Sequence, residues 1–394
     1  MNGRFKTLAL LVFCFIVKHE CFCQAGFNDS LLIQQMLSRI FYLQENHEKD
    51  FPKGLIPSYR EYYHMEGVLK NDDNIFFTGL VVFTLRYLYP DLDKPSQNIC
   101  DSVFADAASV YTRFQNRKGR ATYNFWQTDE PEIFPNSGWL NLFNKSQALP
   151  DDMDVTSIIL LAANETDSTV AQVHRLMQEY ANSNRKRIKS SLPDYKYIKA
   201  YSTWFGKNMP VDFDFGVLTN ILYLVNKYQL PYTSADSASL EFLCKVVENR
   251  HYMKAAAIIS SSYNRTPVLL YHLSRLMAET KIPALEKWKS QLIKDAKSTY
   301  KHSNNLLDKI ILSTSLMRWG VKLPDDTLVI KTSLETFTER NDFVFFIASI
   351  TSMLPRPFNT WLGKTGIGKF YYYCPAYNYT LLLENIIMRK RMKG

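Results

Sequence analysis

Cysteine is scarce in this chain, and its spacing matches no disulfide framework. Three of the six cysteines lie in or beside an apolar N-terminal stretch, and the rest of the chain has only Cys100, Cys244 and Cys374. This odd, widely spaced set contains no Cys-x-x-Cys pair, which excludes the usual cysteine metal sites. A chain of this length can bury a core without cross-links, so we expect buried free thiols, with a single disulfide as the alternative.

Glycine and long apolar runs are also in short supply. Only 14 of the 394 residues are Gly, which argues against an all-β fold with many tight turns. Apolar stretches beyond the N-terminus, such as 343–354, fall short of the roughly 20 residues that a membrane-spanning helix needs. The sequence therefore predicts no integral membrane segment in the mature chain.

The common catalytic signatures do not occur in the sequence. It contains no Gly-x-Ser-x-Gly, His-Glu-x-x-His or Ser/His/Asp pattern, which argues against nucleophile-elbow hydrolases and zinc proteases. The Gly-rich segment 364–369 lacks the spacing of a phosphate loop and the Ser or Thr after its Lys. Any chemistry must therefore depend on other groups.

The first residues predict a cleavable signal peptide, residues 1–25. Basic residues precede the apolar run 7–17, and Ala25 is a small residue suited to the position before a cleavage site. The run is too short to span a bilayer and polar residues follow it directly, with a retained anchor as the alternative. We expect a secreted or periplasmic mature chain, residues 26–394.

The net charge of +9 comes from 47 Lys and Arg against 38 Asp and Glu. Basic residues gather at 185–189 and at 389–393, and either cluster has the charge to bind a polyanion. No aromatic residues alternate with these charges as they do in nucleic-acid platforms. We interpret the clusters as a solvated loop and the last turn of a helix, and we expect no nucleic-acid partner.

Several segments share one pattern, an acidic or polar start followed by an apolar stretch of helical length. Such starts lie at 71–74, 150–154 and 210–214, and weaker ones near 265, 304, 341 and 378. Their side chains can accept hydrogen bonds from the free N–H groups of a first helical turn. Apolar residues then cover nearly every side, so these helices should be buried all round.

Amphipathic segments with more charge lie between the apolar ones. They are 29–45, 98–115, 168–181, 237–248, 284–297 and 328–340. A closed ring of helical hairpins produces this alternation of fully buried and half-exposed helices, and recurrence at intervals of tens of residues is typical of stacked hairpins. We predict an all-α fold, a single α/α toroid of about six hairpins with long aromatic loops, over residues 26–394.

This pattern resembles the α/α toroids of terpenoid cyclases and protein prenyltransferase β subunits, in which successive inner helices begin at one mouth of a barrel. The resemblance covers most of the mature chain and concerns the fold more than the motifs. The segment 151–154 has the composition of the Asp-x-Asp-Asp acid motif of class II cyclases in another order, and no Asp-Asp-x-x-Asp metal motif is complete. His272 is available as in the zinc site of prenyltransferases, but no Cys is placed to complete that set. The (α/α)-barrel glycoside hydrolases and polysaccharide lyases share the helical ring and are commonly exported.

The aspartates at the helix starts are the candidate catalytic residues. If the inner helices are parallel, their first turns meet at one mouth, where crowded carboxylates raise one another's pKa and helix dipoles lower it. One acid can then stay protonated beside an ionised partner, as general acid–base catalysis requires. The alternatives are a Ca²⁺ or Mg²⁺ site, although no cofactor is required, and simple helix caps worth roughly 1 kcal/mol each. The candidates are Asp73, Asp152, Asp154, Asp212 and Asp214.

Two further segments supply candidate substrate-binding residues. The insertion 117–150 has no helical period and is rich in aromatic rings, which can stack on a sugar or simply pack the loop. In the segment 271–275 a His and an Arg one turn apart share a helix face, either as ligand-binding groups or as a core pair. The candidates are Tyr123, Trp126, Trp139, Tyr271, His272 and Arg275.

Together these features predict an exported enzyme that uses carboxylates for acid–base chemistry on a glycan, as a hydrolase or lyase, with its pocket at the Asp-rich mouth. One alternative is a terpenoid-cyclase-like or prenyltransferase-like enzyme that acts on an isoprenoid. Another is a non-catalytic protein that binds a small-molecule ligand. A polar lining with exposed Trp favours a sugar, whereas a deep chamber walled by aromatic rings favours an isoprenoid.

Overall fold

The structure is a computed structural model that describes most of the chain beyond the N-terminal segment. The described residues are 29–46, 50–63, 67–129, 149–184, 186–206, 209–324, 343–363 and 365–393. The predicted signal peptide, the whole of the predicted helix 328–340, and Trp139 lie outside these ranges.

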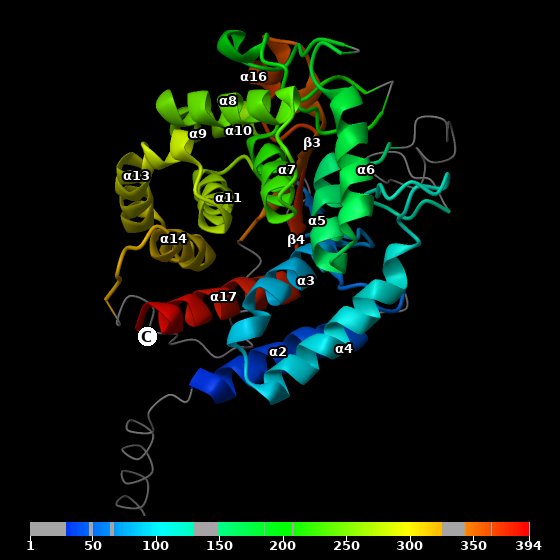
Figure 1. Ribbon diagram of the computed structural model, residues 1–394, viewed down its shortest axis with the longest axis vertical. Coiled ribbons are helices and arrows are strands. Elements are labelled where there is room, and N and C mark those ends of the chain that lie inside the picture. Colours follow the sequence, from blue (N-terminus) through cyan, green and yellow to red (C-terminus); the bar gives the residue numbers. More distant parts are fainter. Residues whose placement is uncertain are drawn as a thin grey trace, which may run out of the picture.

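The described chain is mainly helical, as predicted, but it is not all-α. Six apolar helices contact one another in succession, and the last also contacts the first, so that the series of helix contacts is closed (Figure 1). Each begins at or close to a predicted start, and each is buried on nearly every side because its residues are apolar all round. They are α3 (Phe76–Leu88), α5 (Met153–Ala163), α7 (Phe215–Lys227), α11 (Thr266–Glu279), α14 (Leu306–Arg318) and α17 (Pro375–Lys393).

Longer amphipathic helices pack outside these six, because only one face of each is apolar. Among them, α2 contacts α4 and α17, α4 contacts α3, α8 contacts α7, and α13 contacts α11 and α14. Their bounds are α2 (Asp29–Glu45), α4 (Lys94–Tyr111), α6 (Asp167–Met177), α8 (Ser234–Glu248) and α13 (Lys289–His302). Short helices complete the connections: η1 (Tyr89–Asp91), η3 (Gln178–Tyr180), η4 (Pro193–Tyr195), α9 (His251–Lys254), α10 (Ala256–Ile259), α12 (Pro283–Glu286), η6 (Ile350–Met353) and α16 (Phe358–Leu362).

A four-stranded antiparallel sheet, which the sequence pattern did not predict, joins the two ends of the described chain. One of its strands and the short helix η6 lie where an apolar helix was predicted to begin near 341, so that prediction was wrong. The strands are β1 (Ser58–Tyr62), β2 (Leu69–Asp72), β3 (Phe346–Ser349) and β4 (Lys369–Tyr373), in the order β2-β1-β4-β3. β1 pairs with β4, with Tyr59 opposite Tyr373. Because β2 leads into α3 and β4 leads into α17, the sheet lies at the N-terminal ends of these two helices.

Two of the predicted helix-start aspartates are caps. Asp152 accepts the backbone N–H groups of Asp154 and Val155 at the start of α5, and Asp214 accepts those of Gly216 and Val217 at the start of α7. Each bond satisfies a donor that the helix itself leaves without a partner.

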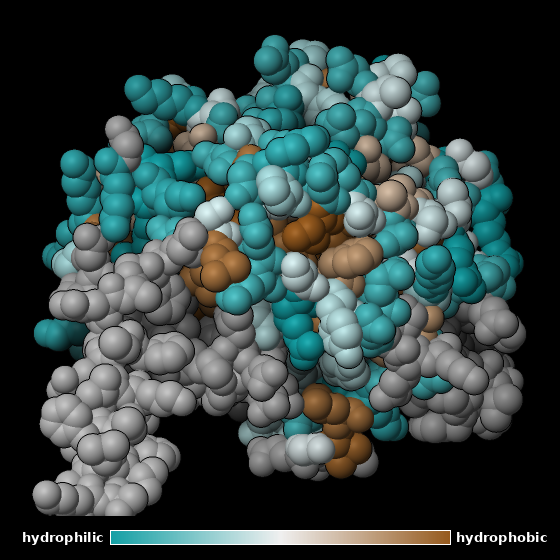
Figure 2. All heavy atoms as spheres, turned by 90° about the horizontal axis from the view of Figure 1, so that it is seen from below, coloured by the Kyte–Doolittle hydropathy of each residue, from teal (hydrophilic) through white to brown (hydrophobic). Residues whose placement is uncertain are grey.

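The three described cysteines are free, as expected. Cys100 and Cys374 are buried and Cys244 is half-buried. Burial raises the pKa of the Cys100 and Cys374 thiols to about 12 each, so both stay protonated at neutral pH. None of the helices in the described ranges is both long enough and apolar enough to cross a membrane. The face seen from below is largely hydrophilic, with small separate apolar patches (Figure 2).

A buried ion pair connects α14 to α17. Arg318 donates to Glu384, and only 1% of each side chain is exposed. The Tyr271 hydroxyl of α11 donates to the other oxygen of Glu384 at 2.7 Å, and its ring lies 4.7 Å from the Arg318 guanidinium. Three neighbouring helices therefore meet at one carboxylate, which has an opposite charge to offset its burial.

We predict that Arg318→Met lowers the free energy of unfolding by about 3–5 kcal/mol, because it leaves Glu384 buried without its partner. Adding Glu384→Gln to this variant should restore a large part of the loss. Lys245→Met, which removes an exposed pair with Glu241, should cost less than about 1 kcal/mol. Urea unfolding measures all three, and equal costs for the two single variants would contradict the prediction.

Candidate functional site

Four of the candidate aspartates come together where α5 and α7 begin. The extended segment before α7 brings them together: the Met153 N–H donates to Thr203 O at 2.8 Å, and the Thr203 N–H donates to Asp212 O at 3.0 Å. Burial raises the pKa of all four carboxyl groups, and the charge of Asp214 raises it further at the other three. The group consists of Asp152, Asp154, Asp212 and Asp214, each at most 7% exposed.

Asp214 has the largest number of donors in this group. Besides capping α7, it accepts hydrogen bonds from the Ser260 hydroxyl at 2.6 Å and the Ser262 N–H at 2.7 Å. Burial raises its pKa, but these donors all stabilise the ionised form and oppose that rise. Ser262 O in turn accepts the N–H of Ile347 in β3 at 2.9 Å. The carboxylate thereby connects α7, the loop before α11 and the sheet.

Asp212 lies beside Asp214 and accepts fewer hydrogen bonds. Its partners are the hydroxyls of Ser190 at 3.2 Å and Ser261 at 3.1 Å. Burial, together with the charge of Asp214, raises the pKa of Asp212 to about 7. The pair therefore divides into a carboxyl that titrates near neutrality and a neighbour that its donors favour as an anion.

Asp212 also lines a small polar cavity. The cavity has a volume of about 20 Å³, which is room for about one water molecule. Lys369 lies on its wall and donates to Gly363 O at 2.6 Å, and burial lowers the pKa of its amine. Most of its lining is polar: Asp212, Ser261, Asn264, Ser349, Ser352, Asn359 and Lys369.

Exposed aromatic rings lie next to this cavity on α16, which Figure 1 shows at one end of the molecule near α8. Trp361 is 63% exposed and Phe358 is 55% exposed, with ring centroids 6.0 Å apart in an edge-on arrangement. Asn359, which lies between them in the sequence, lines the cavity and donates to Ser190 O at 2.6 Å. The helix is thus held beside Asp212 with its aromatic rings facing solvent.

Asp154 lies deeper and connects to the His and Arg of α11. Its carboxyl accepts Asn220 Nδ2 at 2.6 Å and the Tyr263 hydroxyl, and burial raises its pKa to about 7. Asn220 Oδ1 accepts Arg275 Nη2 at 2.5 Å and lies 3.1 Å from His272 Nδ1. Burial and the charges of nearby arginines lower the pKa of His272 well below its ordinary value, so the ring is neutral. The predicted shared face of His272 and Arg275 is confirmed, in a buried network.

The other candidates lie elsewhere. Asp73 is half-buried and accepts Gln127 Nε2 at 2.5 Å. Trp126 is 1% exposed and donates its indole N–H to Asp72 at 3.1 Å, and Tyr123 is 5% exposed. Neither ring is open to stack on a ligand face as it stands. Tyr271 belongs to the ion pair of Arg318 and Glu384 rather than to the aspartate group.

Several residues of the site were not singled out from the sequence. The run of three serines at 260–262 was a visible signal, since consecutive hydroxyls are natural partners for carboxylates. Lys369 lay in a segment that was set aside because it lacked phosphate-loop spacing. The remaining site residues are Ser190, Asn220, Tyr263, Asn359 and Trp361.

No three His, Cys, Asp or Glu side chains are arranged to hold a metal ion within the ranges that the structure describes. No protein-family model matches the chain, and no curated protein is detectably similar to it in sequence. The geometry of the site itself is therefore the basis for assigning a function.

We predict that Asp212 makes the folded chain less stable as pH rises from about 4 to about 7. The folded state keeps a proton on Asp212 over this window, whereas the unfolded chain has already released it. Asp212→Asn should remove this dependence, so the variant should gain about 2 kcal/mol or more over the parent between pH 5 and pH 8. Urea unfolding at the two pH values tests this, and parallel curves for the two proteins would contradict it.

Proposed function

We propose that the chain is an α/α-toroid enzyme that uses Asp212 as a general acid–base group on a glycan. The closed succession of contacts among α3, α5, α7, α11, α14 and α17, with amphipathic helices outside, supports the toroid. The observation that carries the chemistry is the pair of buried carboxyls, Asp212 and Asp214, in different hydrogen-bonding environments.

The pair meets the requirements of acid–base catalysis at neutral pH. A group that gives up a proton and takes it back works best when its pKa lies near the working pH, and the pKa of Asp212 is about 7. Asp214 accepts hydrogen bonds that favour its charge, and this charge helps to keep the proton on Asp212. Because Asp212 lines the cavity, it is the member placed to exchange a proton with a bound molecule.

The lining favours a polar substrate. Serine, asparagine and lysine side chains surround Asp212, and Trp361 presents an exposed ring on the adjoining helix. Hydroxyl groups of a sugar pair with such polar side chains, and its apolar face stacks on an indole ring. A cavity of this size accepts one small group at Asp212, so the rest of a chain-like substrate would lie outside it, toward α16. The predicted signal peptide would place this reaction in the secreted or periplasmic space.

An isoprenoid-cyclising enzyme is the second candidate, and one observation favours it. Asp154 accepts the Tyr263 hydroxyl, and the Tyr263 ring packs against Phe76 and Phe346 at centroid distances of 6.3 and 5.8 Å. A protonated acid beneath aromatic rings suits a reaction with cationic intermediates. In this alternative Asp154, rather than Asp212, is the acid.

The two assignments differ in which variant loses activity. The parent should release reducing ends or unsaturated uronates from one member of a panel of pectate, alginate, hyaluronan, xylan and starch. Asp212→Asn should lower kcat by about 10²- to 10⁴-fold, and the kcat of the parent should change with a pKa near 7. The control is Asp236→Asn. Asp236 is a buried carboxyl on the outer helix α8 that pairs with His174, and its variant should retain the rate per folded molecule.

Unchanged turnover in Asp212→Asn would refute its role. Inactivity of the parent on the whole panel would contradict the glycan assignment. Conversion of an isoprenoid such as squalene, lost in Asp154→Asn and retained in Asp212→Asn, would establish the second candidate instead.

A further inference from the structure

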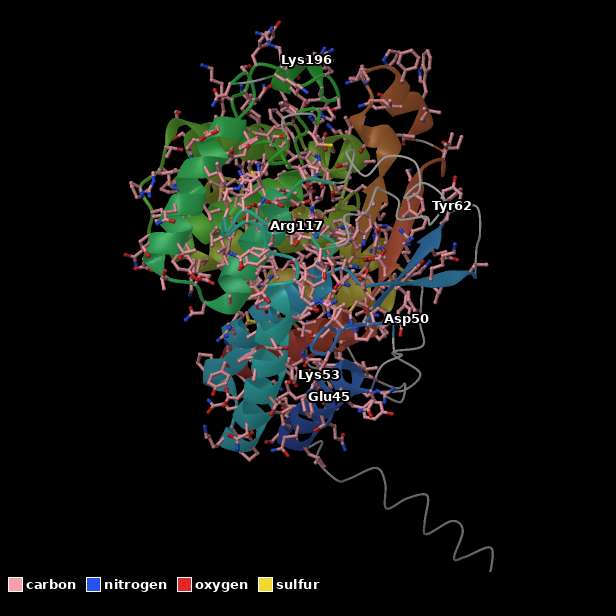
Figure 3. The ribbon with its side chains drawn as sticks, turned by 90° about the vertical axis from the view of Figure 1, so that its right-hand side faces the viewer. Glu45, Asp50, Lys53, Tyr62, Arg117 and Lys196 are labelled. Atoms are coloured by element: carbon pink, nitrogen blue, oxygen red, sulfur yellow. The ribbon has the colours of Figure 1, made fainter. Side chains whose placement is uncertain are left out.

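A groove on the outer wall of the molecule is separate from the Asp212 site. It has a volume of about 850 Å³ and lies between α4, α5 and α6, within the range of roughly 300–1,000 Å³ typical of ligand sites. Figure 3 shows the molecule from this side. Arg117, labelled there, lies in the loop after α4, and other residues of this loop line the groove. Small residues line much of the space and keep it open: Ala108, Gly119, Ala121, Ala162 and Ala163.

The charged residues that line the groove are mainly basic. The lining contains one acidic residue, Glu165, and three basic residues, Arg86, Lys118 and Arg120. The guanidinium of Arg86 is fixed, since its Nε donates to Ala162 O at 2.5 Å and its carbon lies 4.4 Å from the Phe104 ring centroid. A rigid guanidinium fork is the side chain best suited to a carboxylate, which it binds through two parallel hydrogen bonds.

The rest of the polar lining suits hydroxyl groups. Side chains that both donate and accept line the groove, namely Thr112, Gln115, Thr169 and Gln172. The Tyr111 hydroxyl on its wall is buried and has no hydrogen-bond partner among the described residues. Neutral donors and acceptors of this kind recognise sugar hydroxyls rather than a compact inorganic anion.

A second hollow adjoins the groove at Arg86. It has a volume of about 460 Å³ and has Arg86 and Phe104 in its lining as well, together with Tyr87, Tyr89 and Tyr228. Arg86 therefore lies in the wall that two neighbouring hollows share. A single phosphate or sulfate ion would fill neither hollow, whereas an elongated ligand in the groove can place an acidic group at Arg86.

We propose that this groove binds an acidic oligosaccharide, with the carboxylate of a uronate unit at Arg86 and neighbouring hydroxyls on the threonine and glutamine side chains. Arg120 adds long-range attraction at the rim: its side chain is 42% exposed and lies 3.7 Å from Asp151. The site does not depend on chemistry at Asp212, because no residue of the Asp212 cavity lines the groove.

Calorimetric titration of the full chain with tetragalacturonate tests this, with maltotetraose as the neutral sugar of equal length. Tetragalacturonate should bind, and its affinity should fall as salt is added. Arg86→Gln should weaken binding by about tenfold or more, and Arg120→Gln by about threefold. Lys196→Gln is the matched charge control, because Lys196 lies at the top of the view in Figure 3 and does not line the groove, and it should leave the affinity unchanged.

Thermal unfolding of each variant checks that the fold is retained, and Arg120→Gln decides the matter if Arg86→Gln fails to fold. Equal affinity for both sugars, equal weakening by Lys196→Gln, or no binding of tetragalacturonate each overturns the proposal. Asp212→Asn should bind like the parent, so a failed reaction at Asp212 and a failed groove site are distinguishable.

Discussion

The carboxylate of Asp214 accepts hydrogen bonds from two segments of the chain, the first turn of α7 and the serines of 260–262, and the arrangement of the site depends on them. It begins α7, holds the serines of 260–262 in place, and through Ser262 reaches β3. A buried carboxylate is tolerated only when donors surround it, so α7 and the 260–262 segment are confined to the positions in which their donors reach Asp214, and β3 is held indirectly through Ser262. Asp212 is brought beside it by the same short stretch of chain, and this proximity, together with burial, gives Asp212 its raised pKa.

Several of the inner helices carry a charge that matches one of their ends. Acidic side chains lie in or before the first turns, as with Asp152 and Asp214, and arginines lie toward the last turns, as with Arg86 and Arg318. Both placements complement the dipole of the helix that carries them. Asn220 connects the two regions, because its amide donates to Asp154 and its carbonyl accepts from Arg275. Hydrogen bonds through Asn220 therefore link Asp154 to Arg275 in the protein interior.

Local features of the sequence predicted the inner helices and two of their caps. Apolar stretches after acidic starts define α5 and α7 regardless of what packs around them, and the caps at Asp152 and Asp214 are local hydrogen bonds. The sheet could not be predicted in this way, because its strands are short and Tyr59 pairs with Tyr373 across most of the chain. Trp126 was expected to face a ligand, but its indole N–H has a buried partner in Asp72, and no local pattern reveals that distant carboxylate. The cavity at Asp212 likewise depends on Asn359 and Lys369, which come from far along the sequence.

The pairing of β1 with β4 bears on the order in which the protein is built. During synthesis, α3 to α14 can be complete while β1 still lacks its neighbour β4, and the Asp212 cavity then lacks the wall formed by β4 and α16. The wall that Asn359 and Lys369 give to the Asp212 cavity is therefore added last, and it contributes to the burial that raises the pKa of Asp212. A nascent or C-terminally shortened chain would accordingly be a helical protein in which Asp212 lacks part of its cavity wall.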